Sequence, residues 1–382
     1  MIYFDNAATT WPKPIEVKKA IASALDEYGA NPGRGSYDMA LKTSRLIFET
    51  RVELAALFNI KKPERIIFTA NDTEAINLAL KGFLNPGDHV IFTSLEHNAI
   101  YRPLKALEKQ GVSLTMVQAE PDGTVFPEMI ARAMRNETTL LAVSHVSNVT
   151  GTILPIENFA QIVRPKNIKV LVDAAQSAGF LDIDVEKQGI DLLAFPGHKG
   201  LYGPTGIGGL YIGEGINLRP LKEGGTGSKS NSWEQPDTLP DRFESGTINT
   251  LGIAGLRAGI EFLKNKGIKK IREHEWNLTK KFLQGLAEVE QVVVYGPKAD
   301  AFRAPVVSCN IRNCDPGEIS FMLDKMFSIA TRSGFHCAPL THRTIGTKDS
   351  GTIRFSFGAF NTEKEIDVGL DAVKEIINKL EI

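Results

Sequence analysis

The 382-residue chain has few cysteines, a formal net charge of only −1 and no long apolar run. Its three cysteines, Cys309, Cys314 and Cys337, are too few and too close together for a disulfide framework, which favours a reducing cytoplasm as the location. Lys and Arg total 44 against 45 acidic residues, so the composition gives no sign of a nucleic-acid or membrane partner. No stretch approaches the ~20 apolar residues of a membrane span. The segment MIYFDNAATTWPKP also lacks the basic and apolar regions of a secretory signal.

Two common phosphate-binding motifs are missing as well. The chain contains no G-x-x-x-x-G-K-[ST], and GPTGIGG (203–209) lacks the G-x-G-x-x-G spacing. A nucleotide-binding Rossmann function is therefore disfavoured.

Short apolar segments alternate with helical segments through much of the chain. The predicted strands are 64–70, 89–97, 112–118, 138–147, 168–176, 191–197 and 206–212. The predicted helices between them are 72–83, 99–110, 127–135 and 156–163. Strands that are apolar throughout, with helices between them, indicate a parallel sheet covered on both faces.

The pattern changes near Thr247. Two long helices are expected over 250–265 and 268–288. They are followed by predicted strands at 292–295, 306–311 and 352–358, and by helices near 316–326 and after a capping box formed by Thr362 and Glu365. We therefore predict an α/β fold with a large, mostly parallel doubly wound domain (14–250) and a smaller α+β domain (251–382). An N-terminal segment (1–13) is expected to pack with the small domain.

Polar residues follow five of the predicted strands at the point where each strand ends. They are Thr73, Glu74, Glu96, His97, Ser147, Asn148, Asp173, Gln176, His198 and Lys199. Each alone has an ordinary explanation, such as a helix cap. Ligand groups in doubly wound sheets gather at the carboxyl ends of strands, so the five ends together indicate a binding site.

These residue types fit pyridoxal 5'-phosphate, which needs a lysine for a Schiff base and an acid for its pyridine nitrogen. Lys199 is the candidate amine and Asp173 the candidate acid. His97 is the planar group for stacking on the ring, and Gln176 is a donor to the phenolic oxygen. Thr73, at a helix start, offers its hydroxyl and backbone N–H groups to the phosphate. The glycines beside Lys199 are expected to let the backbone approach the ring.

The motifs together resemble those of the cysteine desulfurases in the class V aminotransferase superfamily, which are fold-type I enzymes dependent on pyridoxal phosphate. The matching segments are YFDNAATT (3–10), TEAIN (73–77), LEHNA (95–99), SNVTGT (147–152), VDAAQS (172–177), GHKGLYGPTGIGG (197–209), ESGTIN (244–249), RSGFHCAP (332–339) and TIRFSFGAFNTEKEID (352–367). Each motif is weak alone, but jointly they are specific and cover nearly the whole chain.

The resemblance implies roles around the cofactor. Lys199 would carry the Schiff base and move protons, while Asp173, Gln176 and His97 would hold the ring. The phosphate would be bound by His198 and Thr73, and Glu74 would be a further residue of the cofactor site. Thr247 would reach the phosphate of the other subunit, which implies a homodimer.

The resemblance also implies a substrate site. Arg354 would bind the substrate carboxylate, as a planar bidentate donor can. Asn148 would lie near both the ring and the substrate, with Arg332 and His336 close by. One departure stands out: many relatives carry a serine as a phosphate donor where this chain has Pro196, which has neither a hydroxyl nor an N–H.

Pyridoxal phosphate supports several kinds of reaction, and the role of Cys337 indicates which of them this protein carries out. Cys337 lies beside His336, with Arg332, His342 and Arg343 nearby in sequence, and nearby positive charge favours a nucleophilic thiolate. A free cysteine is more often a buried structural residue, and Cys309 and Cys314 fit that description better. A zinc site from Cys309, Cys314, His336 and Cys337 is disfavoured by poor ligand spacing. In the resembling family, the cysteine of R-x-G-x-H-C-A attacks the substrate sulfur.

We therefore expect a homodimeric, cytoplasmic enzyme that converts L-cysteine to L-alanine and a persulfide on Cys337, often with a partner protein that accepts the sulfur. A selenocysteine lyase with the same residues is the nearest alternative. A second alternative is a class V aminotransferase or epimerase in which Cys337 is incidental. The third is a non-catalytic sulfur-acceptor scaffold, against which the intact Asp173, Lys199 and His97 argue.

Overall fold

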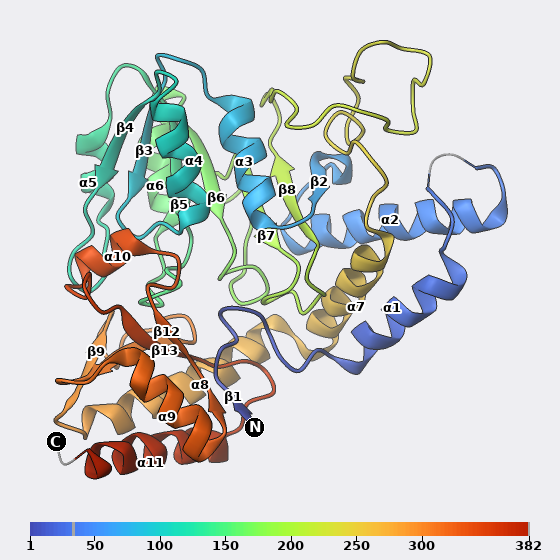
Figure 1. The fold of residues 1–382 in the computed structure, drawn as a ribbon. Helices are drawn as coiled ribbons and strands as arrows, with labels where there is room; N and C mark the ends of the chain where they lie inside the picture. Colours follow the sequence, from blue (N-terminus) through green and yellow to red (C-terminus); the bar gives the residue numbers. More distant parts are fainter. Residues whose placement is uncertain (33–34, 381–382) are drawn as a thin grey trace.

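The computed structural model describes residues 1–32 and 35–380, and its largest element is a seven-stranded sheet (Figure 1). In spatial order its strands are β2 (Ile66–Thr69), β8 (Gly208–Ile212), β7 (Leu192–Pro196), β6 (Lys169–Asp173), β5 (Thr138–Ser144), β3 (His89–Thr93) and β4 (Ser113–Val117). The seven strands predicted from the sequence are all present, each shorter than expected.

Strand β8 runs against the others. It pairs antiparallel with both β7 and β2, whereas the remaining strand pairs of the sheet are parallel. The connection 197–207 between β7 and β8 contains no helix, and a parallel neighbour would need a longer crossover. The large sheet is therefore mostly parallel, as predicted, and β8 is its antiparallel strand. The other six strands point the same way, so their carboxyl ends share one edge.

Helices cover both faces of this sheet. They are α3 (Asp72–Phe83), α4 (Asn98–Glu108), α5 (Pro127–Ala133), α6 (Ile156–Val163) and α7 (Thr250–Lys266). Leu171 packs in the core with residues of α3 and α4, whereas its neighbours Val170 and Val172 pack with residues of α5, α6 and α7. Because side chains alternate along a strand, every strand residue meets a helix layer, which explains strands that are apolar throughout.

A second, four-stranded antiparallel sheet lies beside the large one. Its strands, in order, are β12 (Arg332–Gly334), β13 (Thr352–Ser356), β10 (Val306–Ile311) and β9 (Val292–Tyr295). Its accompanying helices are α8 (Ile268–Ala287), α9 (Pro316–Phe327), α10 (Pro339–Thr344) and α11 (Glu363–Lys379). The predicted capping box of Thr362 and Glu365 begins α11.

The N-terminal segment joins this second region. Strand β1 (Ile2–Tyr3) pairs parallel with β11 (Ile329–Ala330), and Phe4 packs edge-to-face on Phe357. Figure 1 shows the N-terminus beside the C-terminal elements. The domain boundaries at 13 and 250 stay predictions.

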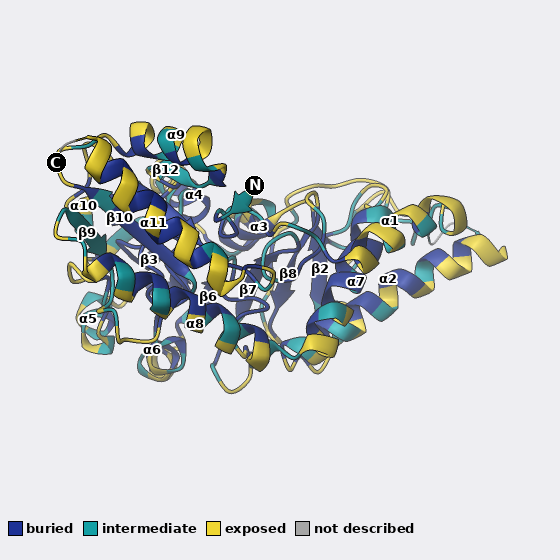
Figure 2. Ribbon diagram, turned by 90° about the horizontal axis from the view of Figure 1, so that it is seen from below, coloured by how far each residue is buried: buried dark blue, intermediate teal, exposed yellow. Residues whose placement is uncertain are grey.

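Two helices to which the sequence analysis assigned no element extend away from the sheet (Figure 1). They are α1 (Ile15–Glu27) and α2 (Asp38–Leu57), and short 3₁₀ turns occur at Pro63–Arg65 and Arg164–Lys166. Ala24 of α1 and Leu46 of α2 pack against Ala254 of α7. Figure 2 shows exposed residues alternating with buried ones along α1 and α2. Within 1–32 and 35–380, no helix has the length and apolar composition to cross a membrane.

Candidate active site

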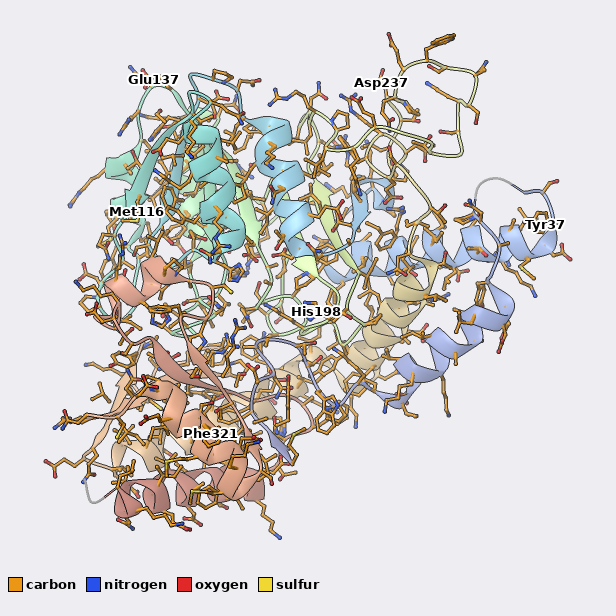
Figure 3. The ribbon with its side chains drawn as sticks, viewed as in Figure 1. Tyr37, Met116, Glu137, His198, Asp237 and Phe321 are labelled. Atoms are coloured by element: carbon orange, nitrogen blue, oxygen red, sulfur yellow. The ribbon has the colours of Figure 1, made fainter. Side chains whose placement is uncertain are left out.

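Ten of the predicted site residues line a single cavity of about 240 Å³ at the carboxyl edge of the large sheet. They are Thr73, His97, Asn148, Asp173, Gln176, His198, Lys199, Arg332, His336 and Arg354. Figure 3 shows His198 near the centre of the molecule, between the large sheet and the C-terminal elements. The strand ends therefore converge as predicted, whereas the roles of the individual residues stay predictions.

Lys199 lies on a tight turn after β7. A Cβ on Gly200 would lie 2.3 Å from the carbonyl oxygen of Ala178, a distance that real Cβ atoms do not show. Gly200 is therefore required for packing between two backbone turns. The expected approach of the backbone to a cofactor ring stays a prediction. Burial lowers the pKa of the Lys199 amine, although Asp173 and Asp72 oppose this shift.

Asp173 ends β6, and its Oδ1 accepts a hydrogen bond from the N–H of Ala175 at 2.8 Å. Burial raises the pKa of this carboxyl, and the Ala175 hydrogen bond and the Lys199 charge oppose the shift. The Gln176 amide donates from Nε2 to the carbonyl of Ala7 at 2.9 Å. The N-terminal segment thus fixes one side of the cavity.

His97 is the N-cap residue of α4, where its Nδ1 accepts a hydrogen bond from the N–H of Ala99 at 3.1 Å. Burial and then the nearby Lys199 charge lower its pKa to about 4. The imidazole is therefore neutral at pH 7 and carries its proton on Nε2. A neutral flat ring suits the predicted stacking role.

The expected phosphate side of the cavity contains Thr73 in the first turn of α3, together with Pro196 and His198. The Nδ1 atom of His198 is buried without a hydrogen-bond partner among the described residues. Burial, with the charges of Lys199 and Lys13, lowers the pKa of His198 to about 4. Pro196 forms part of the wall and offers no hydrogen-bond donor there.

Glu74 does not line this cavity, and its role at the cofactor stays a prediction. Its carboxylate accepts a hydrogen bond from the N–H of Ala70 at 2.6 Å and pairs with Lys222 at 2.5 Å. These contacts stabilise the start of α3.

Arg354 of β13 is 1% exposed and reaches the cavity from the second sheet. Its Nη2 binds Asp5 Oδ1 at 2.7 Å and its Nη1 donates to the carbonyl of Asn148 at 3.1 Å, while its Nε has no partner among the described residues. Burial lowers the pKa of Arg354, and Asp5 opposes the shift. Asp5, which the sequence analysis missed as a site residue, therefore compensates and orients this cation.

Cys337 is exposed beside the cavity on a turn with unusual backbone geometry. His336 and Cys337 have φ angles of +48° and +58°, which non-glycine residues rarely adopt. The carbonyl of His336 accepts from Asn148 Nδ2 at 2.7 Å, and that of Cys337 accepts from the N–H of Asn98 at 2.7 Å. These contacts hold the strained turn in place.

The positive charge in contact with the thiol comes from Arg332, whose Nη2 lies 3.6 Å from Cys337 Sγ. His336 and His342 are buried, and burial lowers their pKa values to about 2 and about 4. Both imidazoles are therefore neutral, which corrects the expectation that they add charge beside Cys337. Arg343 is exposed on α10.

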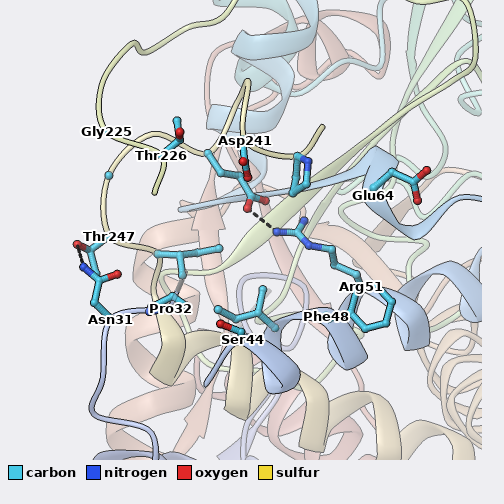
Figure 4. Close-up of a pocket in the computed structure, with 15 residues that line it drawn as sticks. Asn31, Pro32, Ser44, Phe48, Arg51, Glu64, Gly225, Thr226, Asp241 and Thr247 are labelled. Atoms are coloured by element: carbon cyan, nitrogen blue, oxygen red, sulfur yellow. Dashed lines mark hydrogen bonds and ion pairs between the residues drawn. The ribbon is translucent and has the colours of Figure 1, made fainter. Parts of the chain in front are cut away.

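Thr247 lies outside this cavity, in the wall of another pocket of about 280 Å³ that also includes Phe48 and Arg51 of α2 (Figure 4). Its hydroxyl accepts a hydrogen bond from Asn31 Nδ2 at 3.5 Å. Thr247 therefore does not complete the phosphate site of its own chain.

The other cysteines lie away from the cavity lining. Cys309 is buried in β10, and burial raises the pKa of its thiol to about 12. Within the described ranges, no group of three or more His, Cys, Asp or Glu side chains is arranged to hold a metal ion.

Asp72 is a further cavity residue that the sequence analysis missed. It precedes Thr73 and is buried at the first position of α3. An acidic residue at a helix start is ordinary, so only its polar character beside a strand end could have drawn attention to it.

Comparisons with known proteins agree with this geometry. The family model for aminotransferase class-V matches residues 2–368. A probable cysteine desulfurase of Methanothermobacter thermautotrophicus is 35% identical, over 98% of this chain and 94% of the relative. One of Pyrococcus abyssi is 36% identical, over 100% of this chain and 95% of the relative. The apo structure of a cysteine desulfurase from Thermococcus onnurineus NA1 superposes with a TM-score of 0.93 at 34% identity, covering 99% of this chain and 95% of that one. The chain therefore belongs to the aminotransferase class-V family, and within it the chain is similar to cysteine desulfurases.

Proposed function

We propose that this protein is a pyridoxal-phosphate-dependent cysteine desulfurase that converts L-cysteine to L-alanine and takes the sulfur onto Cys337. The observation that carries the proposal is the joint placement of Lys199, Asp173 and Arg354 on one cavity, with Cys337 on a strained turn beside it. Arg332 links the two features, because it lines the cavity and contacts the thiol. The cysteine desulfurases similar in sequence and structure support the same reaction.

The side chains of the cavity fit pyridoxal phosphate. His198 Nδ1 and Arg354 Nε are buried polar atoms without partners in the described chain, and such atoms call for a ligand or water. A phosphate and a substrate carboxylate are suitable acceptors. His198 and Thr73 would hold the phosphate, His97 would stack on the ring, and Asp173 would bind the pyridine nitrogen.

When bound, the cofactor supplies an electron sink for bond changes at the substrate carbon. Lys199 would carry the cofactor, and the lowered pKa of its amine would favour the neutral form that accepts the substrate α-proton. Asp173 would keep the proton on the pyridine nitrogen. Arg354 binds the substrate carboxylate and thereby directs the substrate sulfur toward Cys337.

The sulfur transfer needs no external oxidant or reductant. The Cys337 thiolate attacks the substrate sulfur, a sulfur–sulfur bond forms, and the carbon–sulfur bond breaks with its electron pair left on carbon. Protonation of that carbon and return of the α-proton from Lys199 complete L-alanine. L-cysteine and the Cys337 thiol thus become L-alanine and a Cys337 persulfide.

The reaction is tested by measuring alanine released from L-cysteine and from L-selenocysteine, with and without a thiol reductant. We expect alanine from cysteine, with faster turnover when the reductant removes sulfur from Cys337. A selenocysteine lyase would release alanine from selenocysteine alone. Amino-group transfer to a keto acid without alanine release would instead support the aminotransferase alternative.

A homodimer is the proposed assembly, with Thr247 of each chain reaching the phosphate of the other. Phe48 of α2 is 60% exposed and lines the same pocket as Thr247 (Figure 4). Leu41 and Val52 lie on the same side of α2 and are also exposed. An exposed apolar helix face beside Thr247 is consistent with a subunit interface.

Phe48→Arg is therefore expected to shift the protein from dimer to monomer in light scattering and to weaken pyridoxal phosphate binding. The physical reason is that a charge replaces an apolar contact and the partner no longer supplies Thr247. Phe321→Arg is the matched control, because Phe321 is 62% exposed on α9, outside this pocket. A Phe48→Arg variant that stays dimeric and binds the cofactor normally would contradict the arrangement.

We also propose a cytoplasmic location and a sulfur-acceptor protein as partner. The three cysteines are free thiols, as a reducing compartment favours. Cys337 and its neighbour Phe335 are both exposed, so a partner has access to the persulfide.

A further inference from the structure

Asp72 is a buried acid whose place in the cavity the reaction described above does not use. Its side chain lines the cavity, the residue is only 8% exposed, and its Oδ1 has no hydrogen-bond partner among the described residues. Its carboxyl group also forms a hydrogen bond with the carboxyl group of Asp173. Asp72 therefore contacts the acid assigned to the pyridine nitrogen.

Two carboxyl groups in contact share a proton, because two buried negative charges repel each other strongly. Burial, and then the charge of Asp173, raises the pKa of Asp72 well above its usual range. Burial also raises the pKa of Asp173, but the N–H of Ala175 and the hydrogen bond from Asp72 oppose that shift. Asp173 Oδ1 accepts the N–H of Ala175 at 2.8 Å, whereas Asp72 Oδ1 has no donor among the described residues. The negative charge is therefore better stabilised on Asp173, and the shared proton lies on Asp72.

The surroundings of the pair are consistent with this distribution. Lys199, from the turn after β7, is the cation that acts on both carboxyl groups. His97 and His198 line the same cavity, but burial lowers both pKa values to about 4, so they are neutral at pH 7. A neutral Asp72 also avoids placing a negative charge beside Thr73 and the negatively charged phosphate expected there.

We propose that Asp72 is a positioning residue, which acts as a protonated acid that donates a hydrogen bond to Asp173 and aims the Asp173 carboxylate at the cofactor's pyridine nitrogen. This inference rests on the proposed function. Capping of α3 does not explain Asp72, because other residues already make the capping contacts. Asn71 Oδ1 accepts the N–H of Glu74 at 2.9 Å, and the Glu74 carboxylate accepts the N–H of Ala70.

Two substitutions test whether Asp72 acts by donating a hydrogen bond to Asp173 or only by filling space. Asp72→Asn keeps a donor of nearly the same size, and Asp72→Ala removes the donor. With pyridoxal phosphate bound, we expect Asp72→Ala to lower kcat for cysteine about 10- to 100-fold, in line with the loss of a hydrogen bond to a charged group. KM should change less than about two-fold, because Arg354 still binds the substrate carboxylate. Asp72→Asn should restore kcat to within about three-fold of the parent.

A second readout uses the full chain without cofactor. A group whose pKa is raised by folding contributes stability below its unfolded pKa of about 4, and that stability is lost as pH rises through the folded pKa. The melting temperature of the parent should therefore fall relative to Asp72→Asn as pH increases above about 4. Asp38→Asn is the matched control, because Asp38 is an exposed acid at the same position of α2. Its pH profile should parallel that of the parent.

The outcomes are distinct. Asp72→Ala with parental kcat, Asp72→Asn as impaired as Asp72→Ala, or parallel melting profiles for the parent and Asp72→Asn would each overturn the inference. If Asp72→Ala fails to fold, Asp72→Asn and the melting profiles still decide. If the parent makes no alanine from cysteine, the proposed function fails, while the cofactor-free profiles still report whether Asp72 holds the shared proton.

Discussion

Replacing Cys337 with alanine is expected to abolish alanine and sulfide production from L-cysteine while leaving the fold and the cofactor in place. The thiol is assigned to sulfur capture, it is exposed, and its side chain does not line the cavity. Loss of a nucleophile commonly lowers kcat by about 10³-fold or more. The measurement is kcat for L-cysteine, with the cofactor's absorbance recorded before and after addition of substrate.

The controls for this variant are alanine substitutions of the other two cysteines and turnover of L-selenocysteine in place of L-cysteine. Cys309→Ala should cost only packing stability, because Cys309 is buried in β10, and Cys314→Ala should have little effect. Selenocysteine turnover by Cys337→Ala should suffer less, since the weaker carbon–selenium bond breaks without a protein thiol. Full activity of Cys337→Ala on cysteine would contradict the mechanism and favour an aminotransferase reaction through Lys199.

Asp173→Asn should retain part of the bound pyridoxal phosphate and lose most of the activity. A neutral amide does not keep a proton on the pyridine nitrogen, so the cofactor no longer accepts electrons effectively. Removal of a preorganised catalytic interaction typically costs about 2.7–4 kcal/mol, or ~10²–10³ in rate. Comparison of kcat at saturating cofactor provides the measurement, and turnover within a few-fold of the parent would mean that Asp173 has another role.

Local elements of the fold could be predicted because their patterns are local. The apolar runs of the large sheet and the helices α3 and α6 lie where periodicity and length placed them. The direction of β8 could not be predicted from the sequence. The short connection 197–207 determines it, and β8 is as apolar as the parallel strands of the sheet. Helix α2 was missed because it exposes Leu41, Phe48 and Val52 while burying Thr43 and Arg51, which blurs its apolar stripe.

Site residues that follow a local sequence pattern could be predicted, whereas contacts between residues far apart in the chain could not. Lys199, Asp173 and His97 could be found because each follows a recognisable strand. The pairing of Arg354 with Asp5 joins residues 349 positions apart, which no local pattern reveals. Asp72 had an ordinary explanation as a helix-start acid until the structure placed it beside Asp173. The charge of His336 was misjudged because its burial depends on the packing of distant segments.

The most direct test of the account follows the sulfur atom itself. The protein loaded with pyridoxal phosphate is mixed with L-cysteine without reductant, quenched with an alkylating agent, and analysed for free alanine and for the mass of each cysteine-containing peptide. We predict that the peptide RSGFHCAPLTHR, which contains Cys337, gains one sulfur atom for each alanine released. Alanine formation without added sulfur on this peptide, or with the sulfur on Cys309 or Cys314, would contradict the assignment of Cys337 as the sulfur acceptor.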